Sequence, residues 1–437
     1  MPKQFSRRQF AQTSAAAAGM FYLGSQARAE SSSPNEKLNL GIIGAGGRGG
    51  DNLSGVASEN IVALCDVDDR NLNAAKQRFP KAASFNDFRK LIDAGGLDGV
   101  VISSTDFTHA VAGVRALNAG LHVYCEKPLG HTVAEARAMR LAAEKAQVAT
   151  QMGTQIHAEE NYRRVVEALQ AGVIGNVTEA HVWCNRQSSQ NPVPTGEAPA
   201  PEYLHWDLWL GPASARPFQN GYMPGNTTWN RYWDFGNGII GDMGSHLIDL
   251  PYWALGLEFP TSCEAEAPTA SPVIYPPRMI VRWEHPQRGD GPHQQACKVV
   301  WYDGQSKPNS VLGVDVSGYG IGALFVGERG KLLADYGRKQ IIPLEGTEAP
   351  SDPPKSIAPS LGHHKEWLAA CKTGSPTLCN FSYSGKLIEH NLLGVVSHRV
   401  GKKLEWVAAN LKATNAPEAD QFIYKKYREG WGENLAT

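Results

Sequence analysis

Three glycines with the spacing Gly44-x-Gly46-x-x-Gly49 are the first residues along the chain whose type and spacing indicate a binding function. They directly follow an apolar run, residues 38–43, and precede a stretch that reads as a helix. In such a place the first glycine permits a tight turn, the second lets the backbone approach a pyrophosphate, and the third allows close helix packing. The glycines, with Arg48 inside the loop, are therefore predicted to contact a dinucleotide cofactor.

An acidic residue suited to the ribose of that cofactor follows at Asp66. It ends a second apolar run, residues 61–65, about 20 residues after the loop, where an acid hydrogen-bonds the ribose hydroxyl groups of NAD. Asp66 and Asp68 would together repel a ribose phosphate, so the sequence favours NAD over NADP, although Arg70 lies within reach of such a phosphate. The alternative role for Asp66 is to cap a helix predicted over residues 69–78.

A lysine, an aspartate and a histidine further along the chain have the chemistry to oxidise an alcohol. His246 has an ordinary pKa of about 6.5, so it is mostly neutral and can accept the hydroxyl proton. Lys127 follows an apolar run and would orient the hydroxyl group, with burial and the positive charge of an oxidised nicotinamide both lowering its pKa. Asp242 lies one helical turn before His246 and would bind a neighbouring hydroxyl group or orient the base. Taken singly, each is better explained as a surface or turn residue, and only together do they predict a catalytic site.

The elements that must position these residues alternate along residues 38–155. Strands alternating with helices at this spacing indicate right-handed β-α-β units and a doubly wound parallel sheet, the Rossmann arrangement. Ligands bind at the carboxyl ends of such strands, so Thr105, His109, Glu126 and Gln155, which follow predicted strands, are further predicted cofactor contacts. The predicted strands cover residues 38–43, 61–65, 99–102, 121–125 and 149–152, and the predicted helices cover 69–78, 87–94, 110–119 and 133–147.

Several motifs resemble those of the glucose–fructose oxidoreductase and inositol dehydrogenase (Gfo/Idh/MocA) family of sugar-type dehydrogenases. They are the glycine loop, Cys125-Glu126-Lys127-Pro128-Leu129, and the segment over residues 241–249. The resemblance implies that Lys127, Asp242 and His246 occupy the catalytic positions, with Lys127 also beside the nicotinamide. It further implies a second α/β domain built on a large open, mostly antiparallel sheet, whose face serves for homo-oligomerisation.

The region after residue 155 is predicted to bind the substrate. A helix over 159–171 and strands over 177–183, 278–283, 296–302 and 323–326 fit the implied second domain, which would span residues 156–437. Aromatic faces and polar donors suit a sugar-like ligand, and the alternative for the aromatic residues is a core cluster. The predicted substrate contacts are His157, Tyr162, Arg163, Arg231, Trp233 and Asn237.

The overall composition excludes several kinds of partner and site. The 437 residues include 42 Lys plus Arg and 43 Asp plus Glu, so no basic excess indicates nucleic acid as a partner. The seven cysteines are scattered without a Cys-x-x-Cys pair, which argues against a disulfide framework and against a thiolate zinc site. The histidines show no ligand spacing, and no metal is predicted. A neutral, hydroxyl-rich small molecule remains as the expected ligand.

The first 29 residues read as an export signal rather than as part of the fold. They contain Arg7-Arg8, a weakly apolar run over residues 11–23 and an Ala-x-Ala exit, which together resemble a twin-arginine signal cleaved near Ala29. The apolar run is shorter than the about 20 residues that cross a membrane, so no stable anchor is expected. The signal predicts export of the folded protein through the twin-arginine machinery to the periplasm, with residues 30–37 as a linker.

Export constrains the function, because free nicotinamide cofactors would be scarce in a periplasm. We therefore expect NAD to be tightly bound and regenerated in place. One hypothesis is an oxidoreductase that oxidises a sugar, cyclitol or glycoside and passes the hydride to a second substrate. Another is a redox-neutral glycosidase or lyase acting through a transient keto-sugar; residues 233–238 resemble a stretch of such glycosidases, which lack the lysine found here at Lys127. A third is a non-catalytic, NAD-bearing, sugar-binding protein.

Overall fold

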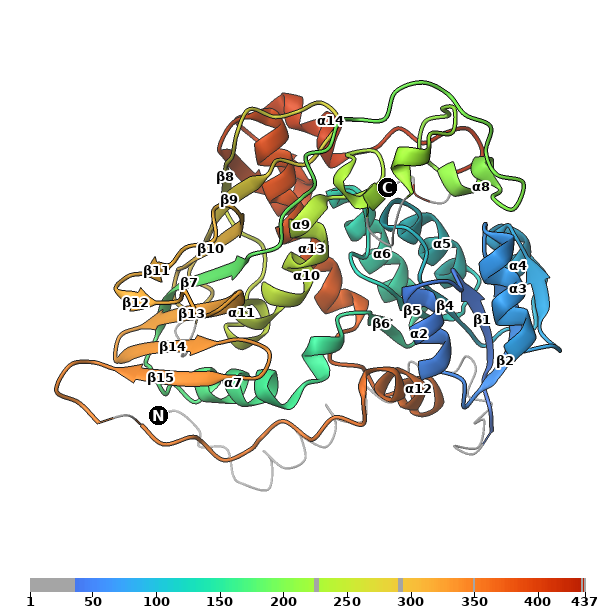
Figure 1. Cartoon of the computed structure of the whole chain (residues 1–437). Coiled ribbons are helices and arrows are strands. Elements are labelled where there is room, and N and C mark those ends of the chain that lie inside the picture. Colours follow the sequence, from blue (N-terminus) through green and yellow to red (C-terminus); the bar gives the residue numbers. More distant parts are fainter. Residues whose placement is uncertain (1–35, 224–227, 290–293, 349, 434, 436–437) are drawn as a thin grey trace, which may run out of the picture. The chain divides into compact units, whose positions relative to one another are not determined.

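A computed structural model of the chain describes residues 36–433 and 435, apart from 224–227, 290–293 and 349 (Figure 1). The predicted export signal, residues 1–29, and most of the predicted linker lie outside the described residues. Of the helices that are described, none is both long and apolar enough to cross a lipid bilayer. From Lys37 onward the chain forms a single unit.

The first sheet is six-stranded and parallel, which confirms the predicted Rossmann fold. Its strands run in the order β3-β2-β1-β4-β5-β6. β1 and β4 are buried almost throughout, as expected for strands with helices on both faces of the sheet. The strands are β1 (Asn39–Ile43), β2 (Asn60–Cys65), β3 (Ala83–Phe85), β4 (Gly99–Ile102), β5 (His122–Cys125) and β6 (Thr150–Met152), and the helices are α2 (Arg48–Gly55), α3 (Asp69–Arg78), α4 (Phe88–Asp93), α5 (Asp106–Asn118) and α6 (Val133–Ala146).

Several of these helices begin where the sequence supplies a capping side chain. α3 begins after Asp68, whose carboxylate accepts a hydrogen bond from the Arg70 amide. α6 begins with a capping box, in which the side chains of Thr132 and Glu135 each accept a hydrogen bond from the other residue's backbone amide. Because Asp68 caps α3, Asp66 is left free for the loop at the end of β2.

The second sheet has nine strands and is antiparallel except for the pair β7 and β10, which confirms the predicted mostly antiparallel sheet. Its strands run in the order β15-β14-β13-β7-β10-β9-β8-β16-β17. These strands are β7 (Val177–Cys184), β8 (Ser262–Glu266), β9 (Arg278–His285), β10 (Cys297–Gly304), β13 (Ile321–Gly327), β14 (Gly330–Ala334), β15 (Lys339–Pro343), β16 (Leu404–Val407) and β17 (Lys412–Ala413), and a separate ribbon pairs β11 (Ser310–Val311) with β12 (Val314–Asp315).

The helices of this second region vary widely in length. The α-helices are α7 (Glu160–Gln170), α8 (Trp206–Leu210), α9 (Gly238–Asp242), α10 (Gly244–Leu247), α11 (Asp249–Ala254), α12 (His363–Thr373), α13 (Phe381–Val400) and α14 (Asp420–Ile423). Short 3-10 helices cover Gln155–Ala158, Asn220–Tyr222, Thr228–Arg231, Ala408–Asn410 and Pro417–Ala419.

Among the helices that differ from the sequence-based expectation are α5 and α13. α5 begins at Asp106 rather than at residue 110, because Thr105 is extended and Asp106 places an acid in the first turn, where the helix dipole favours it. α13 is 20 residues long and buried on most sides, so it lacks the single apolar stripe by which a surface helix is identified in a sequence. It packs along α6, where Glu389 accepts hydrogen bonds from the Arg137 guanidinium at 2.7 and 2.6 Å.

After the long strands of the second sheet the chain returns to the Rossmann sheet. α12 packs against α2, and Trp367 is buried in the same apolar cluster as Leu40 and Tyr124. Nε2 of His364 donates a hydrogen bond to Oδ1 of Asn52 at 2.9 Å. All six strands of the Rossmann sheet precede residue 155, but a helix from beyond that residue packs on the same side of the fold.

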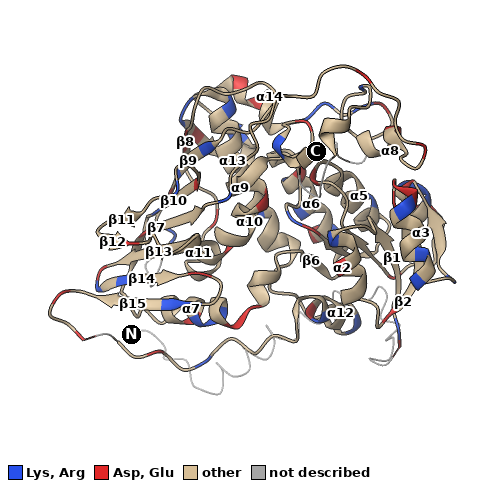
Figure 2. Ribbon diagram, viewed as in Figure 1, with Lys and Arg blue, Asp and Glu red and all other residues tan. Residues whose placement is uncertain are grey.

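Charged residues of both signs are mixed over the molecule, whereas the cysteines lie mostly in its interior. Lys and Arg alternate with Asp and Glu over the ribbon in Figure 2, with no face of one sign in that view. The seven cysteines are free thiols, and all but the partly exposed Cys371 are buried.

Candidate active site

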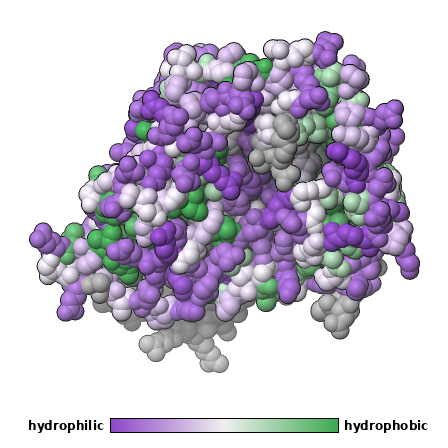
Figure 3. Space-filling model, in the orientation of Figure 1, coloured by the Kyte–Doolittle hydropathy of each residue, from purple (hydrophilic) through white to green (hydrophobic). Residues whose placement is uncertain are grey.

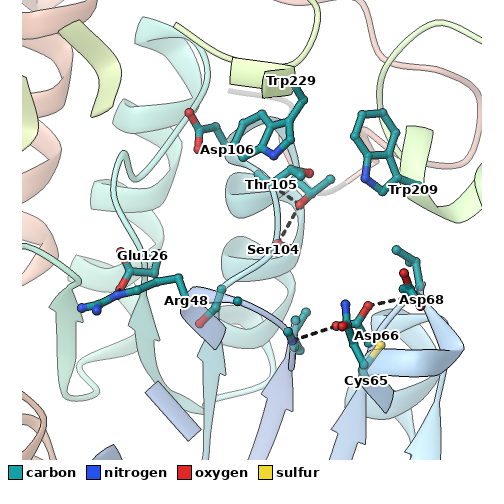
Figure 4. A pocket seen from close by; sticks show the side chains of 18 of the residues that line it. Arg48, Cys65, Asp66, Asp68, Ser104, Thr105, Asp106, Glu126, Trp209 and Trp229 are labelled. Carbon is teal, nitrogen blue, oxygen red and sulfur yellow. Dashed lines mark hydrogen bonds and ion pairs between the residues drawn. The ribbon is translucent and has the colours of Figure 1, made fainter. Parts of the chain in front are cut away.

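A pocket of about 460 Å³ lies at the carboxyl ends of β1, β2, β4 and β5 (Figure 4). One wall is the glycine loop with the residues that follow each strand, and the other comes from between residues 204 and 230, including Trp209 and Trp229. This is the edge of a doubly wound sheet at which ligands bind. The predicted site residues that line the pocket are Gly44, Gly46, Arg48, Asp66, Thr105, His109, Glu126, Lys127 and Asp242.

The glycine loop has the backbone geometry that its sequence predicts. Gly44 has a φ of 82°, a left-handed conformation that favours glycine. A Cβ atom at Gly49 would lie 2.0 Å from the carbonyl oxygen of Gly44, so only glycine lets α2 start this close to β1. The loop thus brings the amino terminus of α2 to the pocket, and such a terminus suits a phosphate group.

Asp66 ties this loop to the end of β2. Its Oδ2 accepts hydrogen bonds from the amides of Ala45 at 2.8 Å and Gly46 at 3.2 Å, and its Oδ1 accepts one from the Asp68 amide at 2.9 Å. Burial raises the pKa of Asp66 above its ordinary value, and the three hydrogen bonds act in the opposite direction. A carboxyl group beside the glycine loop at the end of the second strand fits the ribose of a dinucleotide.

Arg70 is held at the same end of the pocket by two neighbours. Its Nε and one terminal nitrogen donate to Asp68 at 3.0 and 2.7 Å, and its guanidinium group lies 3.6 Å from the centre of the Tyr203 ring. Two acids, Asp66 and Asp68, therefore face one arginine that is already paired. This charge balance favours NAD over NADP, because a ribose phosphate would add negative charge here.

Glu126 is the centre of a hydrogen-bond network at the end of β5. Its Oε1 accepts hydrogen bonds from Nε of Arg48 at 3.1 Å, Nδ2 of Asn52 at 3.0 Å and Nε2 of Gln155 at 2.9 Å. Gln155 itself does not line the pocket, so the structure brings it to the predicted cofactor site only through Glu126.

Lys127 and Asp242 meet at the pocket, although they come from distant parts of the sequence. The Lys127 ammonium donates a hydrogen bond to Oδ1 of Asp242, whose Oδ2 lies 3.2 Å from a terminal nitrogen of Arg186. Burial acts to lower the pKa of Lys127, but the carboxyl groups of Asp242, Glu126 and Asp106 raise it above its ordinary value. Burial alone therefore does not lower the pKa of Lys127, because the surrounding acids outweigh it. For Asp242, burial acts to raise the pKa, and nearby Lys127 brings it below the ordinary value.

His246 lies in α10, which follows α9, so Asp242 and His246 belong to two successive short helices rather than one. Burial, followed by the charge of Lys127, lowers the pKa of His246 to about 4, so its ring is neutral. Its Nδ1 is buried and has no hydrogen-bond partner among the described residues. The ring does not line the pocket, but the charges of Lys127 and Asp242 lie close enough to shift its pKa.

Asp106 is a candidate functional residue of the pocket that is not among the predicted site residues. It lines the pocket from the first turn of α5, is 5% exposed, and has no partner for Oδ2 among the described residues. Burial raises its pKa well above the ordinary value, with Lys127 acting against that rise. Its position directly after a predicted strand, between Thr105 and His109, was the available signal. His109 itself is buried between the carbonyl oxygens of Pro128 and Ser104, 2.7 and 3.0 Å from its ring nitrogens.

Two of the predicted substrate contacts lie beneath the catalytic candidates instead of lining the pocket. Nδ1 of His157 donates a hydrogen bond to Asp249 at 2.9 Å, and its ring stacks on Trp253 with 3.8 Å between the ring centres. The Tyr162 hydroxyl group donates to the backbone carbonyl of His246 at 3.2 Å. Both side chains therefore support the segment that carries His246.

The other four predicted substrate contacts are also absent from the pocket lining and fasten parts of the chain together. All four are buried. Because these side chains are buried and hydrogen-bonded to other parts of the chain, the structure does not bring them to the pocket, and their contact with a substrate stays a prediction. Their partners are Glu366 for Arg163, the carbonyl oxygens of Ser189 and Asn191 for Arg231, that of Ser271 for Trp233, and that of His131 for Asn237.

One group of described residues has the separations of metal ligands. Ligand atoms of His157, Asp249 and Cys379 lie within 4.8 Å of one another. Asp249 already accepts hydrogen bonds from His157 and from the Tyr383 hydroxyl group, the latter at 2.6 Å. Burial raises the pKa of the Cys379 thiol well above its ordinary value, whereas a metal binds the thiolate. Hydrogen bonding therefore accounts for this arrangement.

Residues 203–209, which we call the strap, pair with the chain directly after Asp66. The Asp69 amide donates to the Tyr203 carbonyl at 2.8 Å, and the His205 amide donates to the Val67 carbonyl at 2.9 Å. The His205 ring lies 3.1 Å from the Asp69 carboxylate. The strap residues that line the pocket are Leu204, Leu208 and Trp209. The end of the pocket beside Asp66 is thus covered by residues from outside the Rossmann sheet.

The sequence matches two profiles of one oxidoreductase family: its NAD-binding Rossmann fold over residues 38–154 and its C-terminal alpha/beta domain over residues 173–282. An inositol 2-dehydrogenase of Salmonella paratyphi B is 29% identical over 186 residues, which are 39% of this chain and 54% of that protein. A glucose-6-phosphate 3-dehydrogenase of Bacillus subtilis is 26% identical over 231 residues, 51% of this chain and 55% of that protein. The chain spans about half the length of the curated relatives it matches.

Solved structures show the same fold. The WlbA dehydrogenase from Bordetella pertussis, in complex with NADH and UDP-GlcNAcA, matches with a TM-score of 0.61 and 17% identity, over 85% of this chain and 99% of that one. A levoglucosan dehydrogenase in complex with NADH and L-sorbose matches with a TM-score of 0.56 and 17% identity, over 85% and 99%. With both family profiles in chain order on a Rossmann sheet followed by an open antiparallel sheet, the chain belongs to the NAD-binding Gfo/Idh/MocA oxidoreductase family.

Proposed function

We propose that this protein transfers hydride between bound NAD and a secondary hydroxyl group of a sugar, cyclitol or glycoside. The observation that carries this proposal is the meeting of Lys127 and Asp242 at the pocket that also holds the glycine loop and Asp66. The printed names of the relatives, an inositol dehydrogenase and a glucose-6-phosphate dehydrogenase, support a polyhydroxylated substrate.

In this proposal NAD, when bound, supplies the hydride acceptor, and the protein handles the proton. Lys127 stays an ammonium ion beside Asp242, donates a hydrogen bond to the reacting oxygen and stabilises negative charge on it. His246 is neutral and takes up the hydroxyl proton at a ring nitrogen. Because its pKa is about 4, His246 holds that proton weakly and passes it on. Asp242 orients Lys127 and remains ionised between Lys127 and Arg186.

The strap supports a tightly bound cofactor. It lies over the pocket beside Asp66 and is fixed there by backbone hydrogen bonds to Val67 and Asp69. Release of a dinucleotide from beneath it would require these contacts to open. Retention of this kind suits an exported enzyme, and the pattern of residues 1–29 leads us to propose export by the twin-arginine machinery to the periplasm.

We further propose that copies of the chain associate through the second sheet. Leu312, between β11 and β12, is 53% exposed, and Leu344, directly after β15, is 50% exposed. Figure 3 shows apolar side chains gathered over β11 to β14. An exposed apolar patch of this kind is typical of a surface that pairs with another protein.

The test begins with the purified protein and its bound dinucleotide. Denaturation is expected to release NAD or NADH in an amount equimolar with the protein. A supernatant without dinucleotide would contradict tight binding. The intact protein is then incubated with myo-inositol, D-glucose, levoglucosan and simple glycosides while the absorbance of reduced nicotinamide is followed. Reduction that persists supports hydride transfer. Cleavage of a glycoside without net reduction would favour the redox-neutral hypothesis, and bound sugar without either reaction would favour a binding protein.

A further inference from the structure

We propose that Asp106 and Trp229 form a subsite for a hydroxyl group of a polyhydroxylated ligand, with Asp106 hydrogen-bonding the hydroxyl group and the Trp229 indole packing on the ring that carries it. This inference rests on the proposed function and deepens it. Both residues line the pocket, Asp106 from α5 and Trp229 from the 3-10 helix Thr228–Arg231. Figure 4 shows the Trp229 indole beside the Asp106 carboxyl group.

Asp106 differs from the other acids of the pocket in its unused hydrogen-bonding capacity. Asp66, Glu126 and Asp242 each have partners for both carboxyl oxygens. Oδ2 of Asp106, in contrast, has no partner among the described residues, although Asp106 is 5% exposed. A buried polar atom without a partner costs free energy unless a ligand satisfies it. We therefore expect the missing partner to arrive with the ligand.

The charges around Asp106 favour a neutral hydroxyl group over an ion. The ammonium group of Lys127 is close enough to interact with Asp106 and would repel a cation, whereas Asp242 and Glu126 would repel an anion. Burial raises the pKa of Asp106 well above its ordinary value, and its unpartnered Oδ2 can accept a hydrogen bond from a hydroxyl group. An indole face beside such a group suits the apolar face of a sugar or cyclitol ring.

Hydroxyl groups of this kind occur on the substrate and on the nicotinamide ribose, and the experiment separates these sources. Dissociation constants for myo-inositol, D-glucose and monodeoxy-D-glucoses are measured by tryptophan fluorescence on the purified protein, Asp106→Ala and Asp106→Asn, and dinucleotide content is measured in parallel. Asp420→Ala is the matched control, because Asp420 is also the first residue of its helix but is exposed.

For a substrate hydroxyl group, Asp106→Ala is expected to weaken polyol binding about tenfold, the value of one hydrogen bond, with dinucleotide content unchanged. Asp106→Asn is expected to lose less, and one deoxy sugar is expected to bind the wild type and Asp106→Ala equally. A fall in dinucleotide content with unchanged polyol affinity would identify the ribose as the source.

A lowered melting temperature in both variants, with both affinities unchanged, would overturn the subsite and assign Asp106 a structural role. Polyol binding that depends on Asp106 without any reduction of NAD would contradict the proposed function and leave the subsite standing.

Discussion

Lys127 is the residue on which the proposed chemistry depends most directly. Its ammonium group is buried at the pocket and is kept charged by the carboxyl groups of Asp242, Glu126 and Asp106. A fixed positive charge in a site shielded from water stabilises an alkoxide far better than a solvated one would. In the proposed reaction Lys127 donates a hydrogen bond to the substrate oxygen, and the neutral His246 accepts the proton.

Substitution of Lys127 by Met keeps the length of the side chain and removes its charge. We expect kcat to fall by about 100- to 10,000-fold, the range for a group that handles a proton or a developing charge. The measurement is the rate of reduction of bound NAD by a polyol, with dinucleotide content unchanged. Lys372→Met is the control, because Lys372 pairs with Glu59 away from the pocket. Full activity in Lys127→Met would refute the assignment.

Substitution of Asp66 by Asn tests the cofactor end of the pocket. Asn keeps one acceptor oxygen but loses the charge that holds the amides of Ala45 and Gly46 and that would bind the ribose. Hydrogen bonds to charged groups contribute about 1.5–3 kcal/mol, so NAD affinity is expected to drop by about 10- to 100-fold. The readout is the dinucleotide that copurifies with the protein. Asp93→Asn, on the surface of α4, should copurify with the wild-type amount.

Sequence patterns at this scale identified backbone features better than side-chain partners. The glycine loop and the position of Asp66 follow from local spacing, and the structure shows both at the pocket. Arg163 and Arg231 also had suitable chemistry, but their hydrogen-bond partners lie on distant or separate segments, which no local pattern reveals. Asp106 was missed because its interest comes from a buried carboxyl oxygen without a hydrogen-bond partner among the described residues, which no sequence pattern indicates.

The strap makes a prediction at the scale of elements. Tyr203 packs under the Arg70 guanidinium and His205 pairs with Asp69, so the double variant Tyr203→Ala with His205→Ala removes two side-chain contacts and keeps the backbone bonds. These contacts are worth about 1–1.5 kcal/mol together, and dinucleotide loss is expected to be about tenfold faster.

The measurement is the dinucleotide that remains bound during prolonged dialysis. Tyr424→Ala serves as the control, because Tyr424 is 42% exposed and lies outside the strap. Equal retention in the double variant and the wild type would show that the strap side chains do not hold the cofactor.

The packing of α6 on α13 makes a second prediction at this scale. Glu389 is fully buried between Arg137, at 2.6 Å, and Arg140, at 3.6 Å. Glu389→Ala leaves buried arginine charge uncompensated, which typically costs about 3–5 kcal/mol. The free energy of unfolding in urea measures the loss. Glu418→Ala, which breaks an exposed pair with Lys402, should change it by no more than about 1 kcal/mol.

Helices and strands were predictable where the spacing of their apolar residues matched the face that is buried in the fold. The alternation of apolar strands and amphipathic helices over residues 38–155 predicts five of the six Rossmann strands, with boundaries shifted by a few residues, and misses the three-residue β3. α13 escaped prediction because it is covered by other elements on most sides. β14 to β17 were also not predicted, since strands of two to five residues carry too little period-two pattern to be distinguished from loops.

The whole molecule is expected to lose stability in mild acid. Burial, the largest influence in each case, lowers the pKa to about 4 for His246, His390 and His398 and to about 3 for His363. The unfolded chain, with histidine pKa values of about 6.5, binds these protons first, so the stabilisation is complete above pH 6.5 and is lost as the pH falls toward 4. Each histidine contributes a slope of up to about 1.4 kcal/mol per pH unit.

Asp303 acts in the opposite direction over the same range. Burial raises its pKa to about 6, so the folded state gains its proton first and is stabilised as the pH falls. Asp66 and Asp106 also have raised pKa values, and His131 and His285 also have lowered ones. The histidines still outnumber the acids, so urea unfolding at pH 7 and pH 5 should show a lower free energy of unfolding at pH 5. An equal or higher value at pH 5 would contradict the assignment of these histidines as buried and neutral.

The buried cysteines determine how the chain would tolerate an oxidising compartment. Burial raises the pKa of Cys65, Cys125, Cys263 and Cys379 well above the ordinary value, so thiolate, the form that attacks glutathione disulfide and peroxide, is scarce in the folded protein. An unfolded chain would expose all seven thiols to random cross-linking. A molecule folded before it met oxidants would keep its thiols reduced, whereas one that had to refold outside the cell would accumulate mispaired disulfides.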